Sequence, residues 1–117
     1  MHRPHLPPLR NGPRTAAAVA ALAMALTAAA PLPVRTAHTV IIEGMRFSPQ
    51  NLTVRRGDRV TWINKDPFPH TVTTTNGKFD SHLIAPDGSW TYVATKTGEY
   101  DYVCTLHVTM KGRLTVH

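Results

Sequence analysis

Four side chains able to bind a soft metal ion lie in the second half of the chain. Cys104 is the only cysteine, His107 and Met110 follow it at intervals of three, and a further imidazole, His70, stands upstream. One thiolate, two imidazoles and one thioether suit copper, because soft sulfur and imidazole ligands satisfy both Cu(I) and Cu(II). The sequence therefore predicts a copper site of the electron-transfer kind, with His70, Cys104, His107 and Met110 as ligands.

The spacing of three restricts the local structure around these ligands. In a strand, successive members of such a series point to opposite faces, and on a helix the first and third diverge by about a third of a turn. We therefore expect a loop, between a strand ending at Val103 and one beginning near Lys111, that wraps a single ion. His70 must arrive from another strand end, and Pro67 and Pro69 restrict the backbone just before it.

The segments that must position these ligands have the composition of strands. From Thr39 onward, short runs rich in Val, Thr, Ile, Tyr and Trp are separated by Gly, Pro, Asn and Asp, and no window keeps a helical period. Seven or eight strands at this spacing predict an all-β sandwich. The expected strands are Thr39 to Glu43, a short one around Met45 to Phe47, Asn51 to Arg55, Arg59 to Asn64, His70 to Thr75, Ser89 to Ala94, Gly98 to Val103 and Lys111 to Val116, with a long loop over Asn76 to Gly88.

Two local patterns support this assignment. Tyr100, Tyr102 and Cys104 alternate with Glu99 and Asp101, so the cysteine is expected at the end of a strand on the face that it shares with two tyrosines. The triplet at positions 56–58, Arg-Gly-Asp, resembles an adhesion motif, but Gly-Asp between two strand-like runs is typical of a hairpin turn. We interpret it as a turn.

The N-terminal stretch predicts a secretory signal. Three arginines precede a run from Thr15 to Ala30 that is almost entirely Ala, Val, Leu and Met. The run is too short and too rich in alanine to span a bilayer, where roughly 20 strongly apolar residues are needed, so we expect cleavage within residues 28–37 and no membrane anchor. Residues 1–37 are then a signal peptide, and residues 38–117 form one domain that is periplasmic or secreted.

The charge and the cysteine content narrow the possible functions. The formal net charge is +6, but four of the 13 basic residues precede residue 38, whereas all seven acidic residues lie from Glu43 onward. The domain itself is close to neutral and its basic residues are scattered, so we expect no nucleic-acid partner. A single cysteine excludes an internal disulfide, and a bound metal would explain both the thiol and the stability of so small an exported domain.

The ligand segments resemble those of the cupredoxin family. The run Val60 to Asn64 followed by Pro69-His70, and the run Tyr100 to Thr105 followed by His107 and Met110, are similar to its amicyanin-like members, whose ligand loop is shorter than that of plastocyanin or azurin. The resemblance implies a Greek-key β-sandwich with one type 1 copper ion near one end. It also implies that Asn64 ties the two ligand segments together, whereas the residues alone equally allow a turn-forming Asn.

The same resemblance implies a carrier of single electrons and not an enzyme. Its partners would be redox proteins such as a dehydrogenase or a c-type cytochrome, and we expect a monomer. Electrons would pass at the exposed edge of His107, within an apolar rim of Phe68, Pro69, Leu106 and Val108. Amicyanin has prolines on both sides of its second histidine where this chain has Leu106 and Val108, which leaves the potential and the recognition of an amine-oxidising dehydrogenase open.

Other functions are weighed against this one. A copper chaperone would share the site but release the metal instead of cycling it, and a metal-free binding module would tolerate Cys104→Ser. A multicopper enzyme would need further His clusters that this domain lacks, and a closed zinc site is disfavoured because Met is a poor zinc ligand. His38, His82 and His117 have no partner at ligand spacing and are expected to be surface residues.

Overall fold

The computed structural model describes residues 1–13, 15–25 and 35–117. The chain falls into two units, Met1–Pro31 and Leu32–His117. In the first unit the described residues form no helix or strand and are exposed. No helix in the described part of the chain has the length and hydropathy to cross a membrane. The expected cleavage range, residues 28–37, lies mostly outside the described residues, and the signal peptide stays a prediction.

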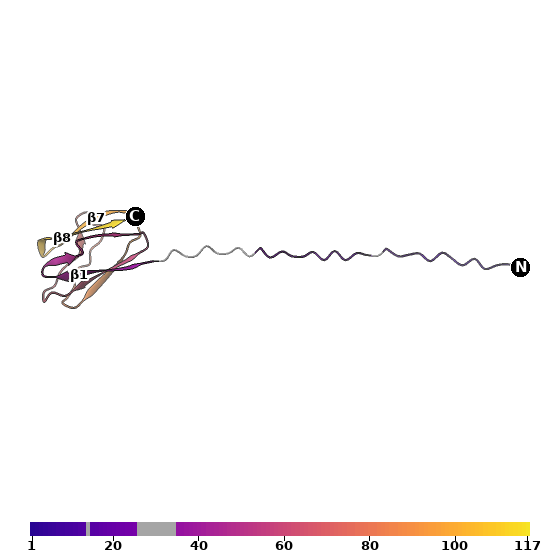
Figure 1. The fold of residues 1–117 in the computed structure, drawn as a ribbon, viewed down its shortest axis with the longest axis horizontal. Coiled ribbons are helices and arrows are strands. Elements are labelled where there is room, and N and C mark those ends of the chain that lie inside the picture. The colour runs from indigo at the N-terminus through magenta and orange to yellow at the C-terminus, as the bar shows by residue number, and fades with distance from the viewer. Residues whose placement is uncertain (14, 26–34) are drawn as a thin grey trace. The chain divides into compact units, whose positions relative to one another are not determined.

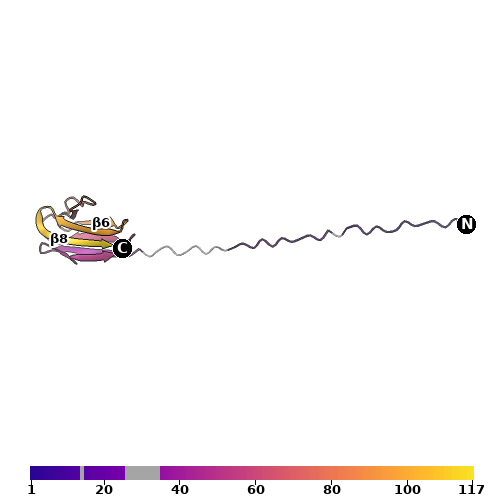
Figure 2. The same cartoon turned by 90° about the horizontal axis from the view of Figure 1, so that it is seen from above.

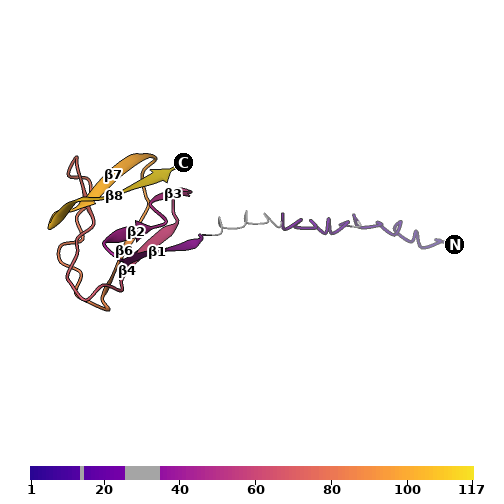
Figure 3. The same cartoon turned by 60° about the vertical axis from the view of Figure 1, so that its left-hand side comes forward.

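The second unit is a sandwich of two four-stranded sheets (Figure 1, Figure 3). The all-β sandwich expected from the sequence is confirmed. The first sheet has the order β2-β1-β4-β6, and its strands are β2 (Arg46–Ser48), β1 (Ala37–Glu43), β4 (Arg59–Asn64) and β6 (Ser89–Val93). The second sheet has the order β3-β8-β7-β5, and its strands are β3 (Asn51–Val54), β8 (His107–Val116), β7 (Gly98–Cys104) and β5 (Thr73–Thr74).

Strand directions define two poles of the sandwich. β1 pairs with β4 in parallel, from Ala37 opposite Arg59 to Ile42 opposite Asn64, so both strands begin at one end, which we call the basal pole. Both finish at the other end, which we call the ligand pole because Cys104 ends β7 there. Figure 3 shows the β7–β8 turn and the loops between β4 and β6 together at this end, away from the C-terminus, and Figure 2 shows the strands running along a shared direction between the poles.

Aromatic side chains fill the space between the sheets. Trp62 from β4 and Tyr102 from β7 are fully buried, and the Trp62 indole N–H donates to the Tyr102 hydroxyl at 3.3 Å. Phe79 anchors the long loop in this core, because its ring centroid lies 4.4 Å from that of Tyr92. The Tyr102 ring also lies against Gly112 on β8, where any Cβ would overlap it.

The strand expected over His70 to Thr75 is reduced to two residues. The backbone N–H of Thr71 donates to Cys104 Sγ at 3.4 Å, and that of Val72 donates to the Ser81 hydroxyl at 2.7 Å. Side chains therefore take the donors that a longer ladder would need. His70 makes only an isolated bridge to Ile84, which leaves it at the edge of the second sheet, beside the β7–β8 turn.

The Arg-Gly-Asp triplet forms a turn, as predicted, but the turn is not a hairpin. β3 and β4 belong to different sheets, so the turn carries the chain from one layer to the other at the basal pole. The N–H of Asp58 donates to the Arg55 carbonyl at 3.0 Å, and Gly57 has a φ of 97°, which suits glycine. Asp58 is buried, so its carboxylate faces the fold and not a partner.

Candidate metal centre

Cys104 and His107 face each other across a tight hairpin and not across an open loop. They form a cross-strand pair joined by two residues, whereas the preceding pair is Val103 with Lys111. Residues 108–110 therefore have no partner on β7 and form a bulge in β8. This corrects the expectation of a loop up to Lys111: the bulge resets the strand alternation, so the spacing of three is compatible with convergence.

The candidate ligand atoms of three residues converge at this hairpin. Cys104 Sγ lies 3.6 Å from His70 Nδ1 and 3.8 Å from His107 Nδ1. All three atoms lie within 4.8 Å of one another, and this is the one such group of three or more among the described residues. Cys104 and His70 are fully buried and His107 is partly exposed. A buried thiol between two imidazoles is a donor set that fits copper.

Met110 lies at the end of the bulge and is buried. Its side chain lines a cavity of about 290 Å³ between β2 and β8, together with Met45 and Phe47. The thioether is therefore shielded at the same hairpin that holds Cys104 and His107. The sequence predicts Met110 as the fourth copper ligand. Its position in the fold is compatible with a long axial contact between the thioether sulfur and a bound copper ion.

Thr71 joins the His70 segment to the hairpin. Its N–H donates to Cys104 Sγ at 3.4 Å, and its hydroxyl accepts the Thr105 N–H at 2.9 Å. A hydrogen bond to the sulfur stabilises the charged thiolate form and orients it toward the imidazoles. Sequence reasoning missed this residue, although it directly follows a predicted ligand.

Asp66 fixes the orientation of His70. Its Oδ2 lies 2.8 Å from His70 Nε2. Burial raises the pKa of Asp66, but the Met45 N–H, the His70 imidazole and the Gly44 N–H together bring this pKa below its usual value. The carboxylate is therefore ionised and accepts, so His70 carries its proton on Nε2 and presents the Nδ1 lone pair to the site. Sequence reasoning missed Asp66. The only feature that could have indicated it is that a carboxylate stands four residues before the predicted ligand His70.

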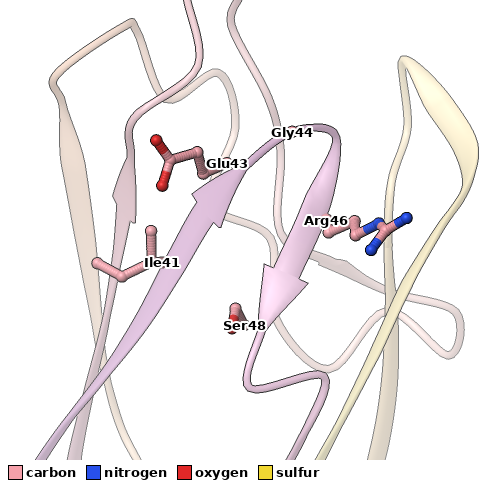
Figure 4. A pocket seen from close by; sticks show the side chains of 5 residues that line it. All are labelled: Ile41, Glu43, Gly44, Arg46 and Ser48. Carbon is pink, nitrogen blue, oxygen red and sulfur yellow. The ribbon is translucent and has the colours of Figure 1, made fainter.

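The turn between β1 and β2 supports Asp66 from the other side. The N–H of Gly44 donates to Asp66 Oδ1 at 2.7 Å and that of Met45 donates to Oδ2 at 3.0 Å. Both residues have a φ near 60°, as a two-residue turn of this kind requires. In Figure 4 the Glu43 and Arg46 side chains flanking this turn point to opposite sides, and the surface hollow there contains none of the candidate ligands.

Asn64 braces the segment that leads to His70. Its amide N–H₂ donates to the carbonyls of Phe68 at 2.7 Å and Ile84 at 3.0 Å, and its Oδ1 accepts the Asp66 N–H at 3.0 Å. The bond to Asp66 is that of a turn-forming Asn, and the other two hold neighbouring loops around His70. The hydrogen bonds that reach the Cys104 hairpin come from Thr71.

His107 is partly exposed, and the sequence predicts an apolar rim around its edge. Phe68, Pro69, Leu106 and Val108, all expected in this rim, are exposed. Leu83 is also exposed and lines a surface hollow together with Thr71 and Thr105, which directly follow the predicted ligands His70 and Cys104. Its position in the long loop offered no sequence signal. His82, beside it, is exposed, and its nearest acidic neighbour is Asp80 at 3.8 Å.

A β-sandwich with a Cys-His-His group at one end, in which the thiol is buried, defines a class of protein, the cupredoxin-like proteins. The chain belongs to this family: residues 15–116 match the cupredoxin-like domain. The family resemblance inferred from the ligand segments is confirmed.

Particular relatives place the chain near amicyanin and plastocyanin. It is 33% identical to amicyanin of Paracoccus denitrificans over 68% of this chain and 65% of the relative. It is 34% identical to plastocyanin of Scenedesmus fuscus over 60% of this chain and 85% of the relative. A solved amicyanin variant in its Cu(I) form matches with a TM-score of 0.67 and 31% identity, over 72% of this chain and 85% of that one. The chain spans just under two thirds of the length of the Paracoccus amicyanins.

Proposed function

We propose that this protein is a type 1 blue copper protein that carries single electrons between redox partners. Copper would be held by His70, Cys104, His107 and Met110. One observation carries the proposal: a buried thiol lies 3.6 and 3.8 Å from the Nδ1 atoms of two histidines that come from different segments. Membership of the cupredoxin-like family supports it.

The surrounding residues suit the exchange of an electron with little movement. Bound copper would supply the chemistry by alternating between Cu(I) and Cu(II). Asp66 holds the His70 ring, and the Thr71 N–H holds the Cys104 sulfur. Because these hydrogen bonds come from the protein itself, they would limit the movement of His70 and Cys104 when bound copper changes its oxidation state.

The spectrum of the copper-loaded protein tests the proposal. Adding one equivalent of Cu(II) to the purified full chain should produce an intense blue band and a narrow copper hyperfine splitting, which a mild reductant bleaches and an oxidant restores. Cys104→Ser should abolish the band, because the thiolate is its source, while His82→Asn should leave it unchanged. A colourless parent protein would refute the proposal, and ready loss of copper to a weak chelator would favour a chaperone.

The axial position is assigned to Met110 because it is buried beside the hairpin. Met110→Ala should retain copper and shift the reduction potential, since a weak axial ligand tunes the potential more than the affinity. An unchanged spectrum and potential would assign the axial contact to another group, such as Thr109 or a backbone carbonyl. Cyclic voltammetry of the parent and the variant distinguishes these outcomes.

Partner docking is proposed at the apolar rim around His107, formed by Phe68, Pro69, Leu106, Val108 and Leu83. Its exposure supports a small, transient contact with a redox protein, such as a dehydrogenase or a c-type cytochrome. Val108→Lys should slow electron transfer in stopped-flow mixing with such a partner, with a nearly unchanged visible spectrum. Val108→Leu is the matched control and should keep the parent rate. A collapsed spectrum in the lysine variant would instead place Val108 among the supports of the site.

Export to the periplasm or medium is proposed from the N-terminal composition, and a monomer is proposed as a separate expectation. The N–H of Thr36 donates to Asp58 at 3.0 Å, and its carbonyl accepts the Arg59 N–H at 3.0 Å. A cut before Thr36 keeps both bonds, so it is favoured within the expected range. The mass of the protein recovered from an exporting host locates the cut, and a full-length mass would refute cleavage.

A further inference from the structure

The basal pole contains a second carboxylate–imidazole pair of the same form as Asp66 and His70. His38 Nε2 lies 3.0 Å from Asp58 Oδ2. Asp58 also accepts two backbone N–H groups, from Thr36 and from Arg55, each at 3.0 Å. His38 stands near the start of β1, whereas the turn that supports Asp66 follows its end. The two pairs are therefore separated by the length of that strand, roughly 20 Å.

The hydrogen bonds of Asp58 decide which nitrogen of His38 is free. The His38 imidazole, the Arg55 N–H and the Thr36 N–H lower the pKa of Asp58 to about 2. The carboxylate is thus ionised at neutral pH and accepts from His38 Nε2, so the neutral ring has its lone pair on Nδ1. Metal-binding histidines commonly have this arrangement, in which a carboxylate holds the far nitrogen. The His38 side chain is 23% exposed, so it is accessible to an ion.

A second imidazole lines the same cavity. The cavity has a volume of about 390 Å³, and its walls include His38, Asp58 and His117. The backbone of His117 is held on both sides, because its N–H donates to the Val54 carbonyl at 3.0 Å and its carbonyl accepts the Arg56 N–H at 2.9 Å. Its side chain is exposed and can turn without moving the backbone. Sequence reasoning left both histidines as surface residues because they stand 79 positions apart.

We propose that this cavity is a second metal site, which takes a divalent transition ion such as Zn²⁺ through His38 Nδ1 and the His117 imidazole. Imidazole is a preferred ligand of such ions. Asp58 orients His38 and places a negative charge beside it, while Arg55, also in the wall, opposes the ion. Among the described residues, the one group of three or more whose ligand atoms already lie within 4.8 Å of one another is His70, Cys104 and His107, so the His117 side chain turns on binding. An ion here ties the start of β1 to the end of β8.

Zinc titration of the copper-loaded full chain tests this site. The protein used for the titration contains the substitutions His2→Gln and His5→Gln, so that the N-terminal imidazoles do not bind zinc. Isothermal titration calorimetry should show one Zn²⁺ bound with no change in the spectrum of the ligand pole. His38→Gln and His117→Gln should each weaken zinc binding at least as much as the loss of an outer-shell partner does, which is roughly 10- to 100-fold. His82→Asn is the matched control, because His82 is also an exposed imidazole near a carboxylate, and it should bind like the parent.

Thermal melting gives a second readout. Zinc in excess should raise the melting temperature of the parent by mass action and should not raise that of His117→Gln. Because the His117 side chain is exposed, this variant stays informative even where His38→Gln loosens the turn at Asp58. The absence of zinc binding to the parent, or binding by both variants as tight as that of the parent, would overturn the proposal and leave the His38–Asp58 pair as a structural fastening only. Neither the calorimetric nor the thermal result depends on the blue band, so a failure of this proposal is distinguishable from a failure of the proposed electron-transfer function.

Discussion

The two poles of the sandwich contain the same carboxylate–imidazole pair in different surroundings. At the ligand pole, Asp66 accepts from His70 and from two backbone N–H groups, and at the basal pole Asp58 does the same with His38. His70 is fully buried and its free nitrogen faces Cys104, whereas His38 is partly exposed and its cavity contains no thiol. The pair orients an imidazole in both places.

The difference teaches that the neighbours of such a pair decide its chemistry. A buried sulfur next to the free nitrogen selects copper and allows redox cycling, because the thiolate stabilises both oxidation states. The His38–Asp58 pair is partly exposed and has a second imidazole nearby but no sulfur. It therefore suits a redox-inactive ion. Four substitutions test this comparison, and the first addresses the more buried pair.

Asp66→Ala should cause the largest loss of stability. It removes the acceptor of His70 and of the Gly44 and Met45 N–H groups, in a site with little access to water. The free energy of unfolding should fall by about 3 kcal/mol, as measured by urea titration of the full chain. The copper spectrum should also change, because His70 loses its orientation. Asp58→Ala should lower the free energy of unfolding by less than Asp66→Ala, since water can reach His38. An equal or greater loss of stability in Asp58→Ala would contradict the comparison.

Gly112→Ala should have an intermediate effect that reaches both poles. The added Cβ overlaps the buried Tyr102 ring, and overpacking of this kind costs about 1 to 3 kcal/mol. The two residues form a cross-strand pair midway along β7 and β8. Tryptophan fluorescence and the copper band should therefore report the same lowered midpoint. Separate midpoints would show that the poles unfold independently, while an unchanged stability would mean that Tyr102 relaxes at no cost.

The smallest expected effect is the acid sensitivity contributed by Asp58. Its pKa is about 2 in the folded protein, against 3.8 ordinarily, so in this range the unfolded state binds more protons. Its contribution to stability is full above about pH 4 and declines as the pH falls toward 2. In urea titrations over this range, Asp58→Asn should lose less stability than the parent protein. Parallel pH profiles for the two proteins would exclude this role for Asp58.

Much of the fold could be predicted from local patterns. Alternation in β7 placed Tyr100, Tyr102 and Cys104 on the buried face, and all three are buried. The position of the turn at residues 56–58 also followed from glycine chemistry. The sequence did not predict that the chain changes sheets at this turn, because a turn residue specifies a reversal of the chain and not the sheet that the next strand joins.

The supports of the site were harder to predict. Asp66 and Thr71 adjoin the ligands in sequence, but aspartate and threonine are ordinary in turns and strands. Their roles depend on groups brought from elsewhere, namely the β1–β2 turn for Asp66 and the β7–β8 hairpin for Thr71. Likewise, Phe79 lies in a segment with loop composition and is buried only because the loop folds back onto Tyr92.

The sequence by itself determined the donor types, the strand pattern and the family, because side-chain chemistry, alternation and short spacings are local properties. Only the tertiary structure decided which histidine nitrogen faces the thiol, how a bulge lets residues three apart converge, and that His38 and His117 share one cavity. These depend on contacts between segments far apart in the chain, since strand pairing and packing of the two sheets set those distances.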